Sequence, residues 1–144
     1  MTQVIANGVQ AELPEGWEDR TMVTLVGPRG ARGFAANIVI TREPIGGAAG
    51  VADYARRQLA AMKAELPRLE VLDEREVAHR GAPAFARLQR FEAGDDVVQQ
   101  AQTFVLSGAT VYVITCSAQR DDFDAHIPAF RQITESFRVG DDAV

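Results

Sequence analysis

The sequence VVQQAQTFVLSGATVYVITCSA, residues 97–118, decides the fold class. Aromatic and β-branched residues are frequent in it, and residues 107–109, Ser-Gly-Ala, have the composition of a tight turn. The pattern predicts two antiparallel strands, 97–106 and 110–118. Because the second is the most apolar and β-branched segment of the chain, we expect it at the centre of a sheet.

The segments just before this pair extend the same pattern. Residues 84–92 form another predicted strand, joined to the strand at 97–106 by a hairpin loop at residues 93–96, Ala-Gly-Asp-Asp. A turn at residues 81–83 precedes it. Residues 69–78 form a further strand, and their many charges indicate a place at the edge of the sheet.

The N-terminal part is also rich in strands. A short strand is predicted at residues 9–13 and ends at Pro-Glu-Gly. Residues 20–26 and 34–41 each alternate between two faces, as strands do. Between them, residues 27–30 are Gly-Pro-Arg-Gly, a typical turn, so the two strands are expected to form a hairpin.

Two segments have helical periodicity. A helix is predicted over residues 51–66, with Asp53 as its N-cap and Pro67 ending it. A second is predicted within residues 122–137, where Pro128 requires either that the helix begins nearby or that it is kinked. Their apolar stripes comprise Ala55, Leu59, Met62 and Leu66 in the first helix, and Phe123, Ile127, Phe130, Ile133 and Phe137 in the second.

This order of elements predicts the architecture. The chain has a strand-rich segment, a helix, a second strand-rich segment and a second helix, in that order. Most of the strands are joined by hairpins. The sequence therefore predicts an α+β fold, a single domain with a mainly antiparallel β-sheet flanked by helices. We place the domain at residues 1–139 and expect residues 140–144 to form a flexible tail.

Charge and composition exclude several classes of protein. Fifteen Lys and Arg residues against 20 Asp and Glu residues give a net charge of −5, which argues against nucleic-acid binding and against attachment to an anionic membrane. No apolar window is long enough to cross a bilayer, and the first residues lack the features of a signal peptide. We therefore expect a cytoplasmic protein.

Residues that could carry chemistry are few and scattered. His79 and His126 are predicted to be surface residues, and Cys116 is predicted to be a buried, inert thiol within an apolar strand. No serine lies in a nucleophile elbow, and the Cys and His residues are too few for a usual zinc site. The sequence thus predicts a protein that is not an enzyme and has no metal and no cofactor.

One mixed surface remains to be explained. On several elements, amide and hydroxyl side chains share a face with apolar ones. A groove of this composition would bind an apolar partner that has a hydrogen-bonding backbone. The alternative is that Asn37, Gln58 and Gln102 are ordinary half-exposed polar residues. The residues concerned are Met22, Thr24, Asn37, Val39, Thr41, Gln58, Met62, Val98, Gln100 and Gln102.

Four blocks of the sequence resemble the DcrB-related family, and the resemblance extends over about residues 4–138. That family is similar in fold to PsbP, which implies an antiparallel sheet with helices packed against it. The blocks are Leu13 to Met22, Asn37 to Pro44, Tyr54 to Leu59, and the closing pattern that contains Phe123, Ile127-Pro128-Ala129-Phe130 and Ser136-Phe137.

Without a signal peptide or a lipobox cysteine, the chain resembles the cytoplasmic members, the Eag chaperones of bacterial type VI secretion. The resemblance implies binding to the N-terminal transmembrane region of a secreted effector, Rhs-type for example, which is held soluble and loaded onto the spike. It also implies a homodimer, because a longer groove needs two copies. The partner-binding residues would be Met22, Met62, Leu66 and Val98, with Thr24, Asn37, Thr41, Gln58 and Gln102 as the polar ones.

Two other functions stay open at this point. The first is a non-catalytic bacterial protein-interaction module of the same fold with an unknown partner. A Ran-binding import factor shares the broad fold. The chain is rich in Ala, Gly and Arg and has a single lysine, Lys63, which resembles the composition of a GC-rich bacterial genome and argues against that role. The second is an enzyme or a small-ligand protein, which would need a pocket with converging His, Asp or Glu side chains.

Overall fold

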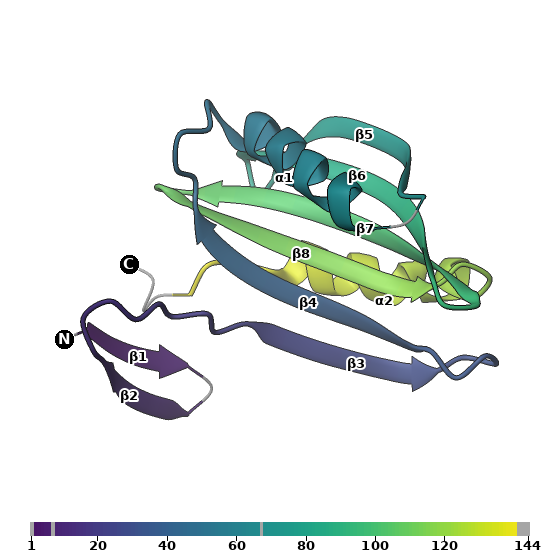
Figure 1. Cartoon of the computed structure of the whole chain (residues 1–144), viewed down its shortest axis with the longest axis horizontal. Coiled ribbons are helices and arrows are strands. Elements are labelled where there is room, and N and C mark those ends of the chain that lie inside the picture. The colour runs from purple at the N-terminus through teal and green to yellow at the C-terminus, as the bar shows by residue number, and fades with distance from the viewer. Residues whose placement is uncertain (1, 7, 67, 141–144) are drawn as a thin grey trace.

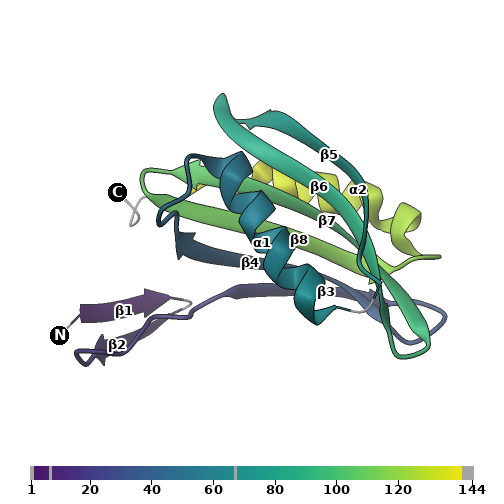
Figure 2. The ribbon, with the colours of Figure 1, turned by 45° about the horizontal axis from the view of Figure 1, so that its top comes forward.

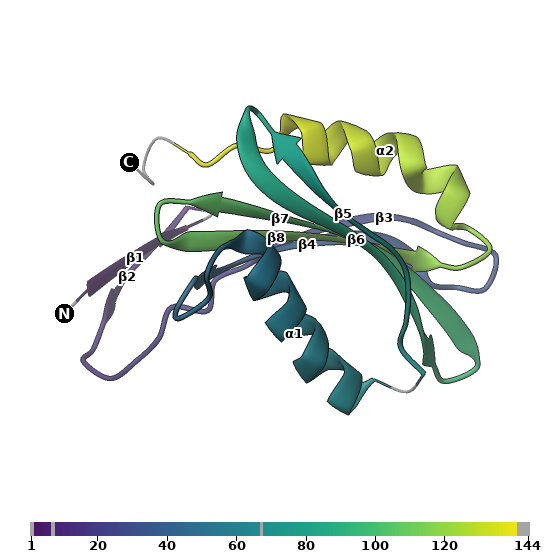
Figure 3. The ribbon, with the colours of Figure 1, turned by 90° about the horizontal axis from the view of Figure 1, so that it is seen from above.

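An antiparallel sheet of six strands, with one helix on each of its faces, carries the fold (Figures 1 and 3). The computed structural model describes residues 2–6, 8–66 and 68–140. The sheet has the strand order β3-β4-β8-β7-β6-β5, and β1 and β2 form a separate two-stranded sheet. The elements are β1 (Thr2–Ala6), β2 (Val9–Leu13), β3 (Val23–Arg29), β4 (Ala35–Pro44), α1 (Val51–Glu65), β5 (Glu70–His79), β6 (Ala82–Ala93), β7 (Asp96–Ser107), β8 (Thr110–Gln119) and α2 (Phe123–Ser136).

The long antiparallel meander β5–β8 agrees with the sequence prediction. β8 and β7 are the two central strands, and β5 is an edge strand as its charges indicated. The β6–β7 and β7–β8 connections are two-residue turns, in which Gly94 and Gly108 both have φ near 61°. This left-handed conformation strains any residue with a Cβ, which explains the glycine in each turn.

The N-terminal region differs from the prediction in two places. β1 was not predicted, and it pairs with β2 in a small sheet set apart from the main one (Figure 1). β3 continues through Gly27, Pro28 and Arg29, which were predicted to form a turn. The turn lies at residues 30–33 instead, closed by a 3.0 Å hydrogen bond from the Gly33 N–H to the Gly30 carbonyl. A proline is tolerated in β3 because edge strands leave half of their backbone groups unpaired.

Helix α1 begins earlier than its predicted cap. Gly50 is the N-cap residue, and the Asp53 carboxylate accepts the backbone N–H of Ala49 at 2.9 Å rather than capping α1. Helix α1 buries Val51 and Ala55 against the sheet, and Leu66 is its C-cap. Pro67, the predicted stop, lies outside the described residues.

Helix α2 runs through Pro128, which lies inside the helix after its first turn. Since a proline has no N–H to donate, the helix loses one internal hydrogen bond there, and the buried aromatic side chains on both sides of it compensate. Phe123 and Phe130 are buried, with ring centroids 5.5 Å apart. They pack on a core formed by Ala36, Ile38, Ile114, Cys116 and Ala118.

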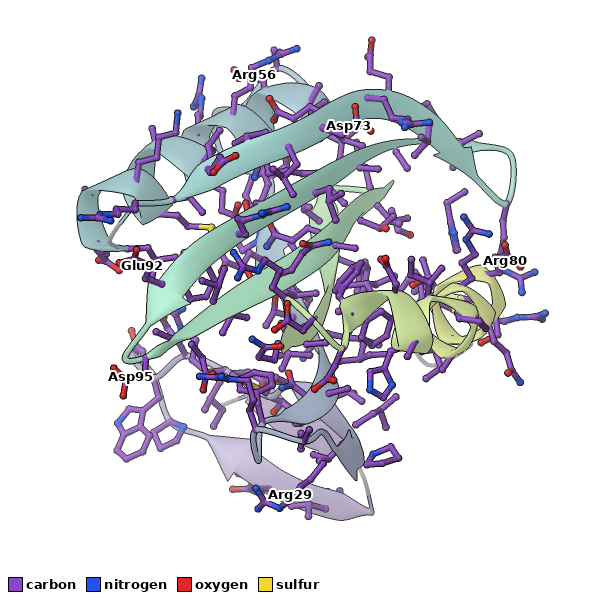
Figure 4. The ribbon with its side chains drawn as sticks, turned by 90° about the vertical axis from the view of Figure 1, so that its right-hand side faces the viewer. Arg29, Arg56, Asp73, Arg80, Glu92 and Asp95 are labelled. Carbon is purple, nitrogen blue, oxygen red and sulfur yellow. The ribbon has the colours of Figure 1, made fainter. Side chains whose placement is uncertain are left out.

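The turn between β5 and β6 holds the C-terminal end of α2. Arg80 donates to the Phe137 carbonyl at 3.0 Å, and His79 Nε2 lies 2.8 Å from the same oxygen. Figure 4 shows Arg80 beside the end of this helix. The prediction that the histidines are surface residues is therefore wrong, because His79 and His126 are both half-buried against aromatic rings.

Candidate binding face

The register of the strands aligns polar residues into two rows on the face that carries α1. Cα partners in an antiparallel sheet share a face. The first row crosses five strands and is polar except for Val39. It comprises Arg87 (β6), Gln102 (β7), Thr115 (β8), Val39 (β4) and Thr24 (β3). It begins beneath α1, because Arg87 Nη2 donates to a carbonyl of that helix.

The second row lies two residues further along each strand. It contains Gln89, Gln100, Ser117 and Asn37. Gln89 Nε2 donates to Gln100 Oε1 at 2.9 Å, and Gln100 Nε2 donates to Ser117 Oγ at 3.0 Å. On the other side of the first row, the face becomes apolar and packs beneath the N-terminal half of α1. That cluster contains Val51, Ala55, Phe85, Phe104, Val111 and Val113.

Helix α1 covers only part of this face. It crosses the strands diagonally (Figure 2) and makes its main contacts with β6 and β7, whereas α2 packs on β8 and β4 from the opposite side. Several side chains on the α1 side of β3, β4 and β8 are partly exposed, although Val111, Val113 and Ser117 on that side of β8 are buried. We call this surface the open face, and it comprises Thr24, Asn37, Val39, Thr41 and Thr115.

Two of the predicted binding residues, Gln58 and Met62, lie on α1, and a third, Leu66, is its C-cap residue. Gln58, Met62 and Leu66 follow one another at intervals of four, which places them along one line of the helix, and all three are half-buried. Gln58 is fixed relative to the sheet, because its Oε1 accepts a hydrogen bond from Arg87 at 3.1 Å. Gln58 is thereby tied to the first polar row, which continues from Arg87 across the sheet to the open face.

The other predicted residues are distributed unevenly. Thr24, Asn37 and Thr41 belong to the open face. Met22 comes just before β3 and is 51% exposed. Gln102, predicted as a partner-binding residue, belongs to the first row but is only 3% exposed, so the alternative that it is an ordinary half-exposed residue is wrong and little of its side chain is accessible. Val98 is buried in the row beyond Gln100, where it pairs with Gln119.

Arg87 is the central residue of this face, and the sequence analysis did not single it out. It is 2% exposed, and its guanidinium carbon lies 5.4 Å from the centroid of the Phe104 ring. Burial lowers the pKa of Arg87, and the adjacent Glu74 carboxylate opposes this. Its hydrogen-bond acceptors are Ala55 O at 2.6 Å, Glu74 Oε2 at 3.0 Å, Gln58 Oε1 at 3.1 Å and Gln102 Oε1 at 3.4 Å.

A second surface lies on the opposite side of the sheet. A cavity of about 120 Å³ lies between α2 and the strands β3 and β4, lined mainly by apolar side chains such as Leu25, Ile38 and Phe130. β3 is the edge strand there, and Leu25 is 42% exposed. The apolar surface of β3 is thus accessible from this side as well.

Residues that could bind a metal ion or react as a nucleophile are dispersed in the part of the chain that the structure describes. Within residues 2–6, 8–66 and 68–140, no group of three or more His, Cys, Asp or Glu side chains could hold a metal ion. Cys116 is buried, as predicted, and burial raises the pKa of its thiol. In the same part of the chain, no helix is long and apolar enough to cross a membrane.

The family model for DcrB matches residues 10–136. The chain belongs to the DcrB family. It is also 26% identical over 137 residues to the Pseudomonas aeruginosa protein named effector EagT6, an alignment that covers 94% of each chain. The resemblance to an Eag protein that the sequence indicated is therefore confirmed.

Solved structures confirm the fold. The crystal structure of PA94, a Pseudomonas aeruginosa protein of unknown function, has a TM-score of 0.81 at 23% identity and covers 97% of each chain. PsbP of the cyanobacterium Synechocystis, solved in solution, has a TM-score of 0.58 at 14% identity, over 91% of this chain and 86% of its own. The predicted α+β, PsbP-like architecture is correct. None of these three relatives is named for an enzymatic activity.

Proposed function

We propose that this protein is a cytoplasmic adaptor of type VI secretion. It binds the N-terminal transmembrane region of an effector, Rhs-type for example, shields that region from water and helps to load the effector onto the spike. The observation that carries the proposal is the open face of a DcrB-family sheet, in a chain related to EagT6. The proposed activity is binding alone, without catalysis.

The open face has suitable dimensions for such a client. A transmembrane helix of about 20 residues is about 30 Å long. β4 has 10 residues, which at ~3.3 Å per residue extend over about 33 Å. One helix could therefore lie along the strands between α1 and the β3 edge, with Val39 and Met62 as apolar contacts.

The remaining surface suits a carrier of an apolar segment. The net charge is −5, and the labelled residues Arg29, Arg56, Asp73 and Glu92 lie at the periphery of the molecule in Figure 4. A charged exterior keeps a protein dispersed when one of its surfaces is apolar. The chain would thus remain in solution with its client bound.

We further propose that the protein works as a homodimer. β3 is an edge strand with apolar side chains exposed, including Val23 and Leu25, and such an edge favours pairing with another strand. A second copy would bury this edge and lengthen the surface available to the client. Light scattering of the purified protein measures this directly, and a monomer at tens of micromolar would contradict it.

Co-expression with an effector fragment tests the client. The fragment carries the N-terminal transmembrane region and is expressed with and without this protein. Wild-type protein should keep the fragment in the supernatant and co-purify with it. Thr24→Arg and Thr41→Arg place a bulky charge on the open face, where the wild-type side chains are exposed or half-buried, and should abolish co-purification.

A matched control separates client binding from folding. Gln132→Arg introduces the same charge at an exposed position of α2, on the other side of the sheet. It should retain the fragment as well as the wild type does. Equal loss of the fragment in all three variants would point to a general charge effect and would contradict the open face as the binding site.

A further inference from the structure

Two of the arginines that the structure describes, Arg87 and Arg90, are withdrawn from solvent, and they differ in their contacts. The other arginines are exposed. Arg87 is buried, and its guanidinium donates to side chains and to a carbonyl of α1. Arg90 is half-buried, but in the described part of the chain its guanidinium has no hydrogen-bond acceptor, and its Nε is completely buried. A desolvated N–H group without an acceptor is unfavourable, so the fold alone does not explain Arg90.

The residue beside Arg90 has the same property. Gln99 on β7 is the Cα partner of Arg90 on β6, so the two side chains share a face. Gln99 is only 8% exposed, yet its amide has no hydrogen-bond partner among residues 2–6, 8–66 and 68–140. The other buried glutamines, which are Gln89, Gln102 and Gln119, each have such a partner. Two withdrawn polar groups without partners are therefore neighbours.

This pair lies on the α2 side of the sheet, away from the open face. Gln99 is the Cα partner of Ala118, which belongs to the core beneath α2. Leu88 and Ala101, which face each other two residues further along the same strands, are half-buried against that core. Helix α2 crosses this side of the sheet, opposite to α1 (Figure 3), and packs mainly on β8 and β4. Arg90 and Gln99 therefore lie at the border of the covered core.

The acidic residues nearest to Arg90 along the strands do not neutralise it. Glu92, two residues further along β6, forms an ion pair with Arg68 at 3.2 Å. Glu70 on β5 is the Cα partner of Arg90, but it is exposed, and no ion pair joins the two in the described part of the chain. Arg90 thus keeps an uncompensated positive charge, although the chain as a whole carries a net charge of −5.

The burial of Arg90 suits it to bind a carboxylate. Its Nε is enclosed, whereas its two terminal nitrogens are not among the buried atoms that lack a partner in the residues described. Packing therefore fixes the inner part of the guanidinium and leaves its end at the surface. A carboxylate can accept two parallel hydrogen bonds from such a fork, and the Gln99 NH₂ group offers a third donor. Little conformational entropy is lost, because the donors are already held in place.

We propose that Arg90 and Gln99 form a docking site for a protein segment that presents an Asp or Glu carboxylate between apolar side chains. The positive charge selects the carboxylate, and Leu88 and Ala101 provide apolar contacts for its neighbours. An apolar transmembrane segment has no such carboxylate, so the segment bound here differs from the proposed client. The site lies across the sheet from the open face and does not depend on the proposed function. Both surfaces could be occupied at once.

Two short peptides test the site. The first is acetyl-Ala-Leu-Glu-Leu-Ala-amide, and the second has Gln in place of Glu. In an NMR titration, the Glu peptide should shift the signals of the Arg90 Nε–H and the Gln99 side-chain amide. It should bind about tenfold more tightly than the Gln peptide, because hydrogen bonds to a charged acceptor are the stronger ones. Equal affinity for the two peptides would overturn the proposal.

Sodium acetate is the third probe, because it carries the carboxylate without the apolar neighbours. It should bind more weakly than the Glu peptide. Equal affinity for acetate and the Glu peptide would mean that the site takes a small anion, and it would overturn the docking of a protein segment.

Removing the cation tests which residue recognises the carboxylate. Arg90→Met keeps a long side chain without charge, and it should abolish the preference for the Glu peptide over the Gln peptide. Arg56→Met is the matched control, because Arg56 is an exposed arginine of α1, on the other side of the sheet. It should keep the preference. If Arg90→Met distinguishes the peptides as the wild type does, the assignment of the site is overturned.

Urea unfolding separates docking from a structural role. Arg90→Met removes a buried N–H group that has no acceptor in the described part of the chain, so its unfolding midpoint should equal or exceed that of the wild type. Gln99→Leu should likewise keep its midpoint while it weakens the Glu peptide by about threefold, through loss of one donor. A clearly lower midpoint for Arg90→Met would show that its acceptors lie within the chain and would overturn the inference.

Discussion

The two faces of the sheet are built from alternate residues of the same strands, yet they serve different purposes. On the α2 side, Ile38, Ile114 and Cys116 are buried beneath Phe123 and Phe130 in a continuous apolar core. On the α1 side, the apolar cluster under the helix gives way to two polar rows and then to the open face. The α2 side is thus apolar along the strands, whereas the α1 side combines a smaller apolar core under the helix with polar residues that are partly exposed.

The largest predicted effect is on the α2 side. Ile114 has no exposed surface, and Ile114→Ala should lower the free energy of unfolding by about 4 kcal/mol, because it removes buried methylene groups and leaves a cavity. Thr115→Ala, the next residue on the opposite face, should cost about 1 kcal/mol. Urea unfolding measures both. Similar losses at the two positions would contradict the division between the faces.

The second prediction concerns Arg87 on the α1 side, which donates hydrogen bonds to Glu74, Gln58, Gln102 and the Ala55 carbonyl. Arg87→Met should lower the free energy of unfolding by about 3 kcal/mol, because it leaves a helix carbonyl and two amide oxygens without their donor. The Glu74 carboxylate is 33% exposed and can be hydrated, which limits the loss. Glu74→Gln should cost about 1 kcal/mol. If Arg87→Met is neutral, this residue does not hold α1 on the sheet.

Arg87 also shows where prediction from the sequence ends. The strands around it could be predicted, because alternation and glycine turns are local signals. An arginine in a strand normally indicates a solvent-exposed face. Arg87 can be buried because the fold brings acceptors to it, and these acceptors lie 13, 15, 29 and 32 residues away along the chain. Gln102 was misjudged for the same reason, since no local pattern shows that a cation lies beside it. Such pairing depends on tertiary structure.

At Pro28, by contrast, a strong local signal in the sequence led to a wrong prediction. Gly-Pro-Arg-Gly has strong turn chemistry, and the sequence therefore predicted that the strand ends before residue 27. In the structure β3 continues to Arg29, but its register with β4 shifts between Val26 and Arg29, so the proline lies in an irregular part of an edge strand where its nitrogen needs no partner. The position of a strand within its sheet can thus overrule a local signal. Helical spacing is a local signal too, and it put Met62 and Leu66 on one apolar stripe with Gln58 at its border.

A third prediction measures access to the two faces by thiol labelling. Cys116 is buried on the α2 side, and burial raises the pKa of its thiol, so less of the reactive thiolate is present at a given pH than for an exposed thiol. Iodoacetamide should therefore label native protein slowly, with a rate that rises as the pH is raised. Thr115→Cys in a Cys116→Ser background should react at least about tenfold faster at pH 8. Equal rates would mean that the open face is closed in solution.

The smallest predicted effect tests whether the open face contributes to stability at all. Thr41 is half-buried there, and Thr41→Val keeps the β-branched shape, so the free energy of unfolding should change by less than about 0.5 kcal/mol. Ile40, its neighbour, packs against the core of the α2 side, and Ile40→Thr should cost about 1–2 kcal/mol by burying a hydroxyl among apolar groups. Chemical denaturation of both variants gives the difference. A loss at Thr41 as large as the loss at Ile40 would show that polar groups of the open face stabilise the fold, and their presence would then need no client to explain it.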